Sequence, residues 1–182
     1  MSGDDDKARF TRVVMPHLAD AYALARWLTG DRMDAEDVVQ EASLRAFRAI
    51  GGYAGGSARA WVLTIVRHTA YSWLSKNRRP TLVAVDDLAA VEQAQAKHGG
   101  NPDGPGAATP EAELIMKADA AQLEAAIAAL PEQFRETLVL RDIQGLDYRE
   151  IAQVTEVPIG TVMSRLARAR RRLIESIGTD KP

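Results

Sequence analysis

The sequence contains no cysteine, and this absence removes several classes of function at once. A chain without thiols forms no disulfide, no cysteine-ligated zinc finger and no thiolate redox sensor. Its three histidines are dispersed along the chain and do not form a metal-ligand motif. We therefore expect neither a metal ion nor a cofactor.

Long hydrophobic runs are also missing. No apolar segment is long enough to span a bilayer and no signal-peptide pattern is present, so we expect no membrane insertion and a cytoplasmic protein. The sequence likewise lacks a glycine-rich phosphate loop, a nucleophile elbow and a metal-ligand cluster. An enzyme is therefore not expected.

Charge of both signs is present but unevenly placed on a chain whose formal net charge is −2. The first quarter is acidic, whereas the segments 59–79 and 161–173 each carry five basic residues and no acid. Two basic surfaces on a slightly acidic protein predict local contacts with nucleic acid rather than a globally cationic protein.

The hydrophobic pattern is helical almost throughout, without a convincing alternating strand. We predict an all-α fold with two small helical domains, at 1–79 and 111–182, the second ending in a helix-turn-helix. Between them, residues 80–110 are rich in glycine, proline and polar side chains. Such a stretch cannot bury enough surface to offset its ordering entropy, so we interpret it as a flexible linker.

Three helices are expected in the first domain, at about 13–29, 34–50 and 57–79. Pro16 disturbs or starts the first helix, and Gly30 ends it. The second helix carries acids in its first turn, where the helix dipole favours them. A glycine-rich loop precedes the third helix, which we expect Ser57 to cap and Pro80 to end.

Two further helices, at about 111–130 and 131–143, lead into the helix-turn-helix. Asp147 and Glu150 have the spacing of a capping box at the start of its first helix. Pro158 suits the first helical position of its second helix.

The helix at 161–173 has one narrow apolar stripe, formed by Val162, Leu166, Ala169 and Leu173. Ser164, Ala167, Arg168 and Arg171 point the opposite way, with Thr161 and Met163 beside them. A short capped helix, a tight turn and a basic second helix are typical of a unit that enters the DNA major groove. The alternative is a solvated basic face on an ordinary bundle helix.

Two separated sets of motifs resemble the extracytoplasmic-function sigma factors, the minimal bacterial initiation factors. The first set is the run 34–41 followed by Phe47 and the run 61–67. The second is the run 130–132, then 147–152 and 158–166. The resemblance covers nearly the whole chain. It implies binding to core RNA polymerase and to promoter DNA, and control by an anti-sigma factor.

In this family the first domain docks on the polymerase clamp and captures the −10 promoter element. Side chains at helical spacing on or beside one face of the second helix are the candidates for the polymerase contact: Asp37, Gln40, Glu41 and Arg45. The alternative for Glu41 is that it only solubilises its helix.

The −10 element is expected to meet the glycine-rich loop and the third helix. Capture of flipped bases needs close backbone approach, an apolar or aromatic wall, and cations for the phosphates. The candidates are Tyr53, Gly55, Gly56, Ser57, Ala58, Arg59, Arg67, Lys76, Arg78 and Arg79. We interpret Trp61 as a core residue, because Ile65 lies one turn away. We expect His68 to make a polar contact or to pack half-buried.

The −35 element is expected to meet the helix-turn-helix. Thr161, Ser164 and Arg168 are the candidates for contact with base edges, since arginine pairs bidentately with guanine and serine is permissive. Contacts to phosphates, or to acids of the same chain, are expected from Arg165, Arg171 and Arg172. Arg149 is a further phosphate candidate.

Two other functions remain open at this point. Helix-turn-helix units of this type also end conventional transcription regulators, although the first domain does not have the alternating strands of a receiver. A sigma-like decoy that sequesters an anti-sigma factor is the second alternative, but a decoy needs neither basic helix.

Overall fold

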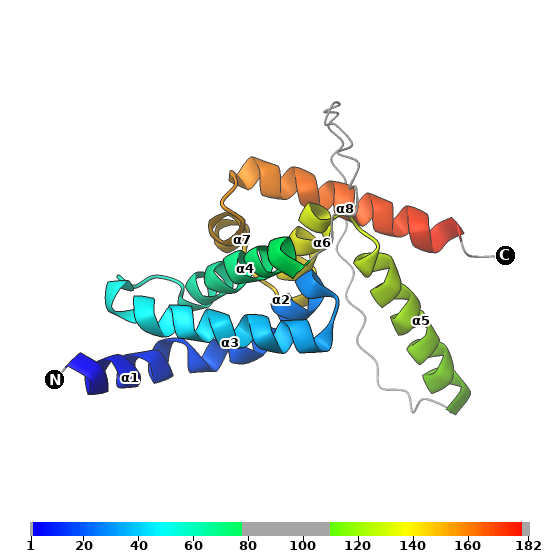
Figure 1. The fold of residues 1–182 in the computed structure, drawn as a ribbon. Helices are drawn as coiled ribbons and strands as arrows, with labels where there is room; N and C mark the ends of the chain where they lie inside the picture. Colours follow the sequence, from blue (N-terminus) through cyan, green and yellow to red (C-terminus); the bar gives the residue numbers. More distant parts are fainter. Residues whose placement is uncertain (1, 78–109, 180–182) are drawn as a thin grey trace.

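The computed structural model describes residues 2–77 and 110–179, which we call the N-terminal part and the C-terminal part. Both consist of helices and turns, without a strand in either range, which confirms the predicted all-α fold (Figure 1). Most of the predicted linker, 80–109, lies outside the described residues, as do Arg78 and Arg79. In the described ranges, no helix is long and apolar enough to cross a membrane.

Three helices of the N-terminal part pack around a common core. They are α2 (Leu18–Thr29), α3 (Arg32–Ala49) and α4 (Ala58–Asn77), and each contacts the other two. Fully buried aliphatic side chains fill the space between them, among them Leu24, Leu28, Val38, Leu63 and Val66. This bundle fixes the outward faces of α3 and α4, which carry the predicted polymerase and −10 residues.

An additional helix, α1 (Ser2–Val13), precedes the bundle and was not predicted. The expected helix at 13–29 is interrupted by the short 3₁₀ turn η1 (Met15–His17), with Pro16 in its first positions, and α2 begins only at Leu18. Proline lacks the amide proton that a continuous helix would need there. Phe10 of α1 packs edge-on against Phe47 of α3, with ring centroids 5.5 Å apart.

The ends of these helices follow local rules of capping. Gly30 ends α2 in the left-handed conformation, with φ of 74°, as predicted. The side chain of Asp31 caps α3 by accepting from the amides of Met33 and Asp34, so α3 starts two residues earlier than expected. After the 3₁₀ turn η2 (Ile50–Gly52), the hydroxyl of Ser57 accepts from the amide of Ala60 at 3.2 Å and caps α4, as predicted.

The C-terminal part contains α5 (Pro110–Ala128), α6 (Glu132–Leu138), the π-helical turn η3 (Val139–Ile143), α7 (Tyr148–Thr155) and α8 (Ile159–Thr179). The predicted helix at 131–143 is therefore α6 continued by η3. The amide of Gln144 donates to the carbonyl of Val139, a wider turn than that of an α-helix.

The predicted helix-turn-helix is formed by α7 and α8. Asp147 and Glu150 make the capping box at the start of α7. Glu156 ends that helix with φ of 57°. The prediction for Pro158 was wrong by one position: its carbonyl accepts from Thr161 and Val162, so it lies at the N-cap and Ile159 is the first helical residue.

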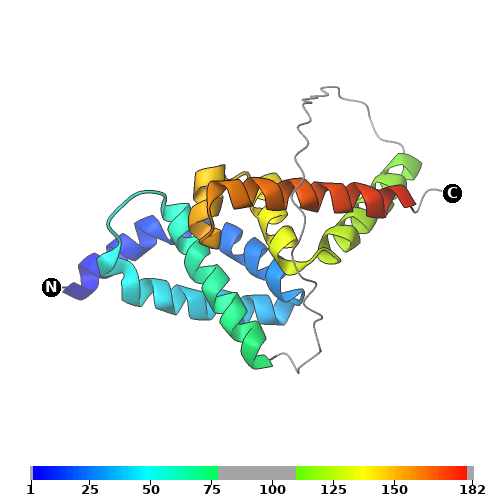
Figure 2. The same cartoon turned by 90° about the horizontal axis from the view of Figure 1, so that it is seen from above.

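The two parts pack directly against each other. Helix α4 lies against α7, and α2 lies against α6, so the buried residues of both parts form one continuous cluster (Figures 1 and 2). Helix α8 runs along the far side of α6 and α7 from the N-terminal part (Figure 1).

Candidate polymerase and nucleic-acid interfaces

Helix α8 buries the predicted stripe and exposes most of the predicted outer face. Val162, Leu166 and Ala169 are buried, and Leu173 is half-buried. On the outer face Ser164 and Arg171 are exposed, as is Met163 at 51 %. Thr161 and Arg168 are half-buried. The orientation predicted for this helix is confirmed.

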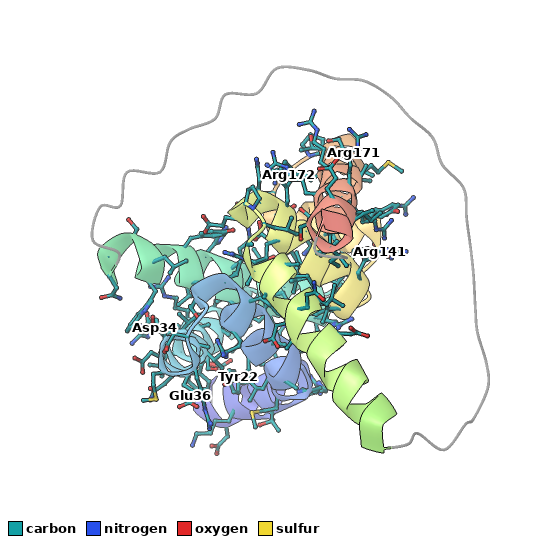
Figure 3. The ribbon with its side chains drawn as sticks, turned by 90° about the vertical axis from the view of Figure 1, so that its right-hand side faces the viewer. Tyr22, Asp34, Glu36, Arg141, Arg171 and Arg172 are labelled. Atoms are coloured by element: carbon teal, nitrogen blue, oxygen red, sulfur yellow. The ribbon has the colours of Figure 1, made fainter. Side chains whose placement is uncertain are left out.

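The arginines of α8 differ in their surroundings. Arg171 and Arg172 are both exposed. The guanidinium of Arg172 also lies over the ring of Phe134, 5.1 Å from its centroid. Figure 3 shows both side chains on the outside of the C-terminal part, on the side of the molecule opposite Asp34 and Glu36. Burial raises the pKa of the Glu136 carboxyl, and the charge of half-buried Arg165 is one of those that oppose this; a contact with an acid of the same chain is the alternative that we expected for Arg165.

One arginine that sequence reasoning left unassigned serves the structure of this part. Arg170 donates from two nitrogens to the carboxylate of Asp142, at 3.1 and 2.6 Å, and ties α8 to η3. Arg149 is exposed in the first turn of α7.

The glycine-rich loop has a defined conformation. Gly55 and Gly56 have φ of 105° and 91°, which side chains with a Cβ rarely adopt. The hydroxyl of Tyr53 donates to the carbonyl of Gly56 at 2.8 Å, and its ring lies 5.1 Å from that of Trp61. Trp61 is half-buried against the core, which fits the interpretation of it as a packing residue.

Helix α1 contributes a contact to this loop that sequence reasoning missed. The guanidinium of Arg9 donates to the carbonyl of Tyr53 and lies 6.0 Å from the centroid of its ring. A stable N-terminal helix was not expected, so no signal in the sequence pointed to this contact.

Three of the residues predicted for the −10 element are occupied by other parts of the protein. Arg59 donates to the carboxylate of Asp20 and to the carbonyl of Gln144, each at 2.7 Å. Arg67 donates to the carboxylate of Glu136, and the hydroxyl of Ser57 donates to Glu150 at 2.7 Å. Lys76 is exposed, whereas Ala58 is half-buried. The structure therefore brings the loop and α4 together, but it holds the guanidinium groups of Arg59 and Arg67 in contacts within the chain.

Other side chains of α4 also interact with the C-terminal part. The ring nitrogen Nε2 of His68 lies 2.9 Å from the carboxylate of Glu156, which is the polar contact expected for it. The ring of Tyr71 lies 4.8 Å from the guanidinium carbon of Arg67, and burial raises the pKa of its hydroxyl. Burial also raises the pKa of Glu136, although Arg67 and Tyr71 oppose this. The indole nitrogen of Trp73 is buried and finds no hydrogen-bond partner among the described residues.

The predicted polymerase residues lie on α3. Asp37 and Gln40 are exposed. Glu41 is half-buried and accepts from Arg45 at 2.8 Å, which lowers the pKa of the Glu41 carboxyl.

Exposed apolar side chains share this face of α3 and were missed as candidates. They are Met33, Leu44 and Phe47, which are 65, 49 and 39 % exposed. Together with Asp37 and Gln40 they recur at intervals of three or four residues, which places all five on one side of a helix. An apolar stripe on the solvent side of a helix is typical of a protein-binding face.

A cleft of about 520 Å³ lies where α2 meets α5 and α6. Its lining includes Tyr22, Arg26 and Trp27 from the N-terminal part, and Glu124 and Arg135 from the C-terminal part. No group of three metal-ligating side chains occurs within the described residues.

In comparisons with known proteins, both parts of the chain match regions of the same protein family. Residues 13–80 match the model of sigma-70 region 2, and residues 120–173 match that of sigma-70 region 4. The chain is 33 % identical to the RNA polymerase sigma-H factor of Pseudomonas aeruginosa, over 94 % of this chain and 88 % of that protein. It is 37 % identical to the ECF RNA polymerase sigma-E factor of Escherichia coli, over 77 % of this chain and 72 % of that protein.

Among solved structures, the sigma factor RpoE in complex with the anti-sigma factor NepR from Bartonella quintana is similar, with a TM-score of 0.67 and 26 % identity. The match covers 94 % of this chain and 98 % of that one. CnrH in complex with the cytosolic domain of CnrY has the same fold, with a TM-score of 0.64 and 21 % identity over 94 % of this chain and 89 % of that one.

Proposed function

The chain belongs to the extracytoplasmic-function sigma factors of RNA polymerase, and from this membership we propose how its surfaces divide the work of promoter recognition. It binds core RNA polymerase and directs the enzyme to specific promoters. The observation that carries this proposal is the exposed polar face of α8, held outward by a buried apolar stripe behind a capped α7.

The C-terminal part, within a domain at 111–182, reads the −35 element. Thr161, Ser164 and Arg168 face the base edges in the major groove, where a bidentate arginine discriminates guanine. Phosphates are held by Arg149, Arg171 and Arg172, which supply affinity without sequence information.

The N-terminal part, within a domain at 1–79, engages the polymerase and the −10 element. The exposed face of α3 contacts the polymerase through Asp37, Gln40, Glu41 and Arg45, with Met33 and Leu44 adding apolar area. The glycine-rich loop and α4 capture −10 bases. A linker at 80–110 lets the two domains occupy elements that are far apart on the promoter.

An anti-sigma factor controls this chain. The similar structure of RpoE with NepR supports this, and so does the cleft between α2 and α5, because it is lined by both parts. A protein bound there would hold the two parts together.

This role makes the chain a transcription factor, not an enzyme, that acts in the cytoplasm together with the polymerase and needs no metal or cofactor. Catalysis of RNA synthesis belongs to core polymerase.

Transcription in vitro tests the proposal. Core RNA polymerase is supplied with a library of promoter sequences, with and without the purified chain. We expect specific transcripts only when both proteins are present, and poor promoter binding by the chain alone, because two weak sites need a scaffold that fixes their separation. Tight sequence-specific binding by the chain alone would favour a conventional regulator. Absence of transcripts would favour the decoy.

A further inference from the structure

The start of helix α8 carries large apolar side chains on its solvent side. Ile159 is 40 % exposed and Met163 is 51 % exposed, and Ala167 is exposed as well. These three residues follow one another at intervals of four, so they lie along one line of the helix surface. They are distinct from the stripe of Val162 and Leu166, which is buried in the core. We call the three exposed residues the apolar edge of α8.

Backbone hydrogen bonds hold the first turn of α8 in place. The carbonyl of Pro158 accepts from the amides of Thr161 at 2.9 Å and Val162 at 3.1 Å. The start of α8 thereby lies beside α7, at the upper edge of the molecule in Figure 1. In helix-turn-helix proteins the N-terminal residues of the second helix meet the base edges of DNA. Ile159 and Met163 both belong to the first two turns of α8.

The apolar edge borders the residues proposed above to read base edges. Ser164 follows Met163 directly, and Arg168 follows Ala167 directly. Because successive residues of an α-helix are rotated by about 100°, the two sets lie on adjoining faces of one helix. A helix that places Ser164 and Arg168 in the major groove therefore brings the apolar edge into the same groove.

The chemistry of these side chains limits what they can recognise in a groove. Isoleucine and alanine side chains have no hydrogen-bonding group, and the thioether of methionine is only a weak acceptor. They therefore cannot read the pattern of donors and acceptors that distinguishes most base pairs. The C5-methyl group of thymine is the apolar group that the four bases present in the major groove. Methionine is unbranched and flexible, so Met163 can adapt its shape to such a group.

We propose that the apolar edge of α8 recognises thymine methyl groups in the −35 element, with Met163 as its main contact. This inference rests on the function proposed above and names the base that this part of the site selects. Contiguous exposed apolar side chains mark a binding surface, and this surface continues the face proposed to read bases. The −35 element is thus read in two ways, by hydrogen bonds on one face of α8 and by apolar contact on the next.

Replacement of thymine by uracil tests the proposal, because uracil keeps the hydrogen-bonding groups of thymine and lacks only the methyl group. Core polymerase with the full chain is given a promoter that the unmodified chain selects, with uracil at one −35 position at a time on either strand. Competition binding should show about fourfold weaker binding at one or two positions, the effect of removing one buried methyl group, and no change at the others. A selected −35 element without an A·T pair, or one in which no uracil weakens binding, would overturn the inference.

Variants of Met163 show whether this side chain makes the contact. Met163→Ala should bind the thymine and uracil promoters equally, and alanine keeps α8 helical. Met163→Leu retains a large apolar group and should still prefer thymine. Ile174→Ala is the matched control, because Ile174 is an apolar residue of the same helix, 71 % exposed, about three turns beyond Met163. It should prefer thymine as strongly as the unmodified chain. An undiminished preference in Met163→Ala would refute the assignment.

A promoter whose whole −35 element is replaced by unrelated sequence distinguishes this inference from the proposed function. If that replacement does not weaken binding of the complete polymerase, the helix-turn-helix does not read the promoter and the proposed function fails. If it weakens binding while uracil has no effect at any position, the proposed function stands and the inference alone is wrong.

Discussion

Arg67 on α4 donates to the carboxylate of Glu136 on α6, and this ion pair joins residues 69 positions apart across the contact between the two parts. Glu136 is almost wholly buried, with Arg67, Tyr71 and Arg165 around it. A charge in such a place is costly unless it is paired, and removal of one partner leaves the other without compensation.

The first prediction concerns pH. Burial raises the pKa of Glu136 above its ordinary value of 4.5. The folded chain therefore binds a proton more readily than the unfolded chain at this site. As pH falls through the raised pKa toward 4.5, the free energy of unfolding should gain a contribution that is absent at higher pH.

Urea unfolding at several pH values checks this with Glu136→Gln, which cannot titrate. The difference in unfolding free energy, wild type minus Glu136→Gln, should grow as pH is lowered in that window. Asp142→Asn, which removes a more exposed carboxylate within the C-terminal part, is the control. A difference that does not vary with pH would show that Glu136 titrates normally.

The second prediction separates base reading from phosphate contact on α8. Arg168→Ala should cost about 1–3 kcal/mol and relax base preference at one position of the −35 element. Arg172→Ala should weaken binding to all promoters about equally and flatten its salt dependence. Promoter-library selection with each variant at two salt concentrations measures both. Unchanged base preference in Arg168→Ala would shift the reading role to Ser164 or Arg165.

The third prediction concerns the polymerase face of α3. Replacing Gln40 and Glu41 together with alanine, or Leu44 alone, should weaken binding to core polymerase by about tenfold, the effect of losing roughly 1.4 kcal/mol of contact. Helical content by circular dichroism should not change, because these side chains project from the bundle.

Glu36→Ala is the control for α3, since its exposed ion pair with Arg32 should contribute little. If the Gln40 and Glu41 double variant unfolds, these side chains are structural and the polymerase must bind elsewhere.

The fourth prediction assigns Arg9 to the glycine-rich loop. Arg9→Ala removes a charge-assisted hydrogen bond to the carbonyl of Tyr53, which should loosen the loop by about 1.5 kcal/mol. We expect weaker and less selective use of the −10 element with unchanged −35 preference. Promoter-library transcription checks this, with Arg12→Ala, an exposed position on the same helix, as the control. Equal −10 selectivity in both variants would leave α1 without a role in the loop.

Local signals predicted most of the helices and their ends. The stripe of Val162, Leu166 and Ala169 and the capping box at Asp147 each depend on residues a few positions apart, so their patterns are visible in the sequence. Pro158 was misplaced by one position because proline is acceptable both at the N-cap and one residue later.

Contacts between distant residues could not be predicted in this way. Arg59 and Arg67 lie in a segment without acids and were interpreted as DNA-binding cations, but Asp20 and Glu136 lie 39 and 69 residues away. Periodicity describes which face of a helix is buried, not which helix covers it. For the same reason the contacts of Arg9 with the loop and of His68 with Glu156 became apparent only in the structure.

The hydrogen bond from Ser57 to Glu150 joins two helix starts, because Ser57 caps α4 and Glu150 belongs to the capping box of α7. First turns are where helices fray, since their amides have no acceptors within the helix. Removal of either side chain therefore takes a partner from both helix starts. Local unfolding of the first turn of α4 and of the first turn of α7 is coupled through this single hydrogen bond.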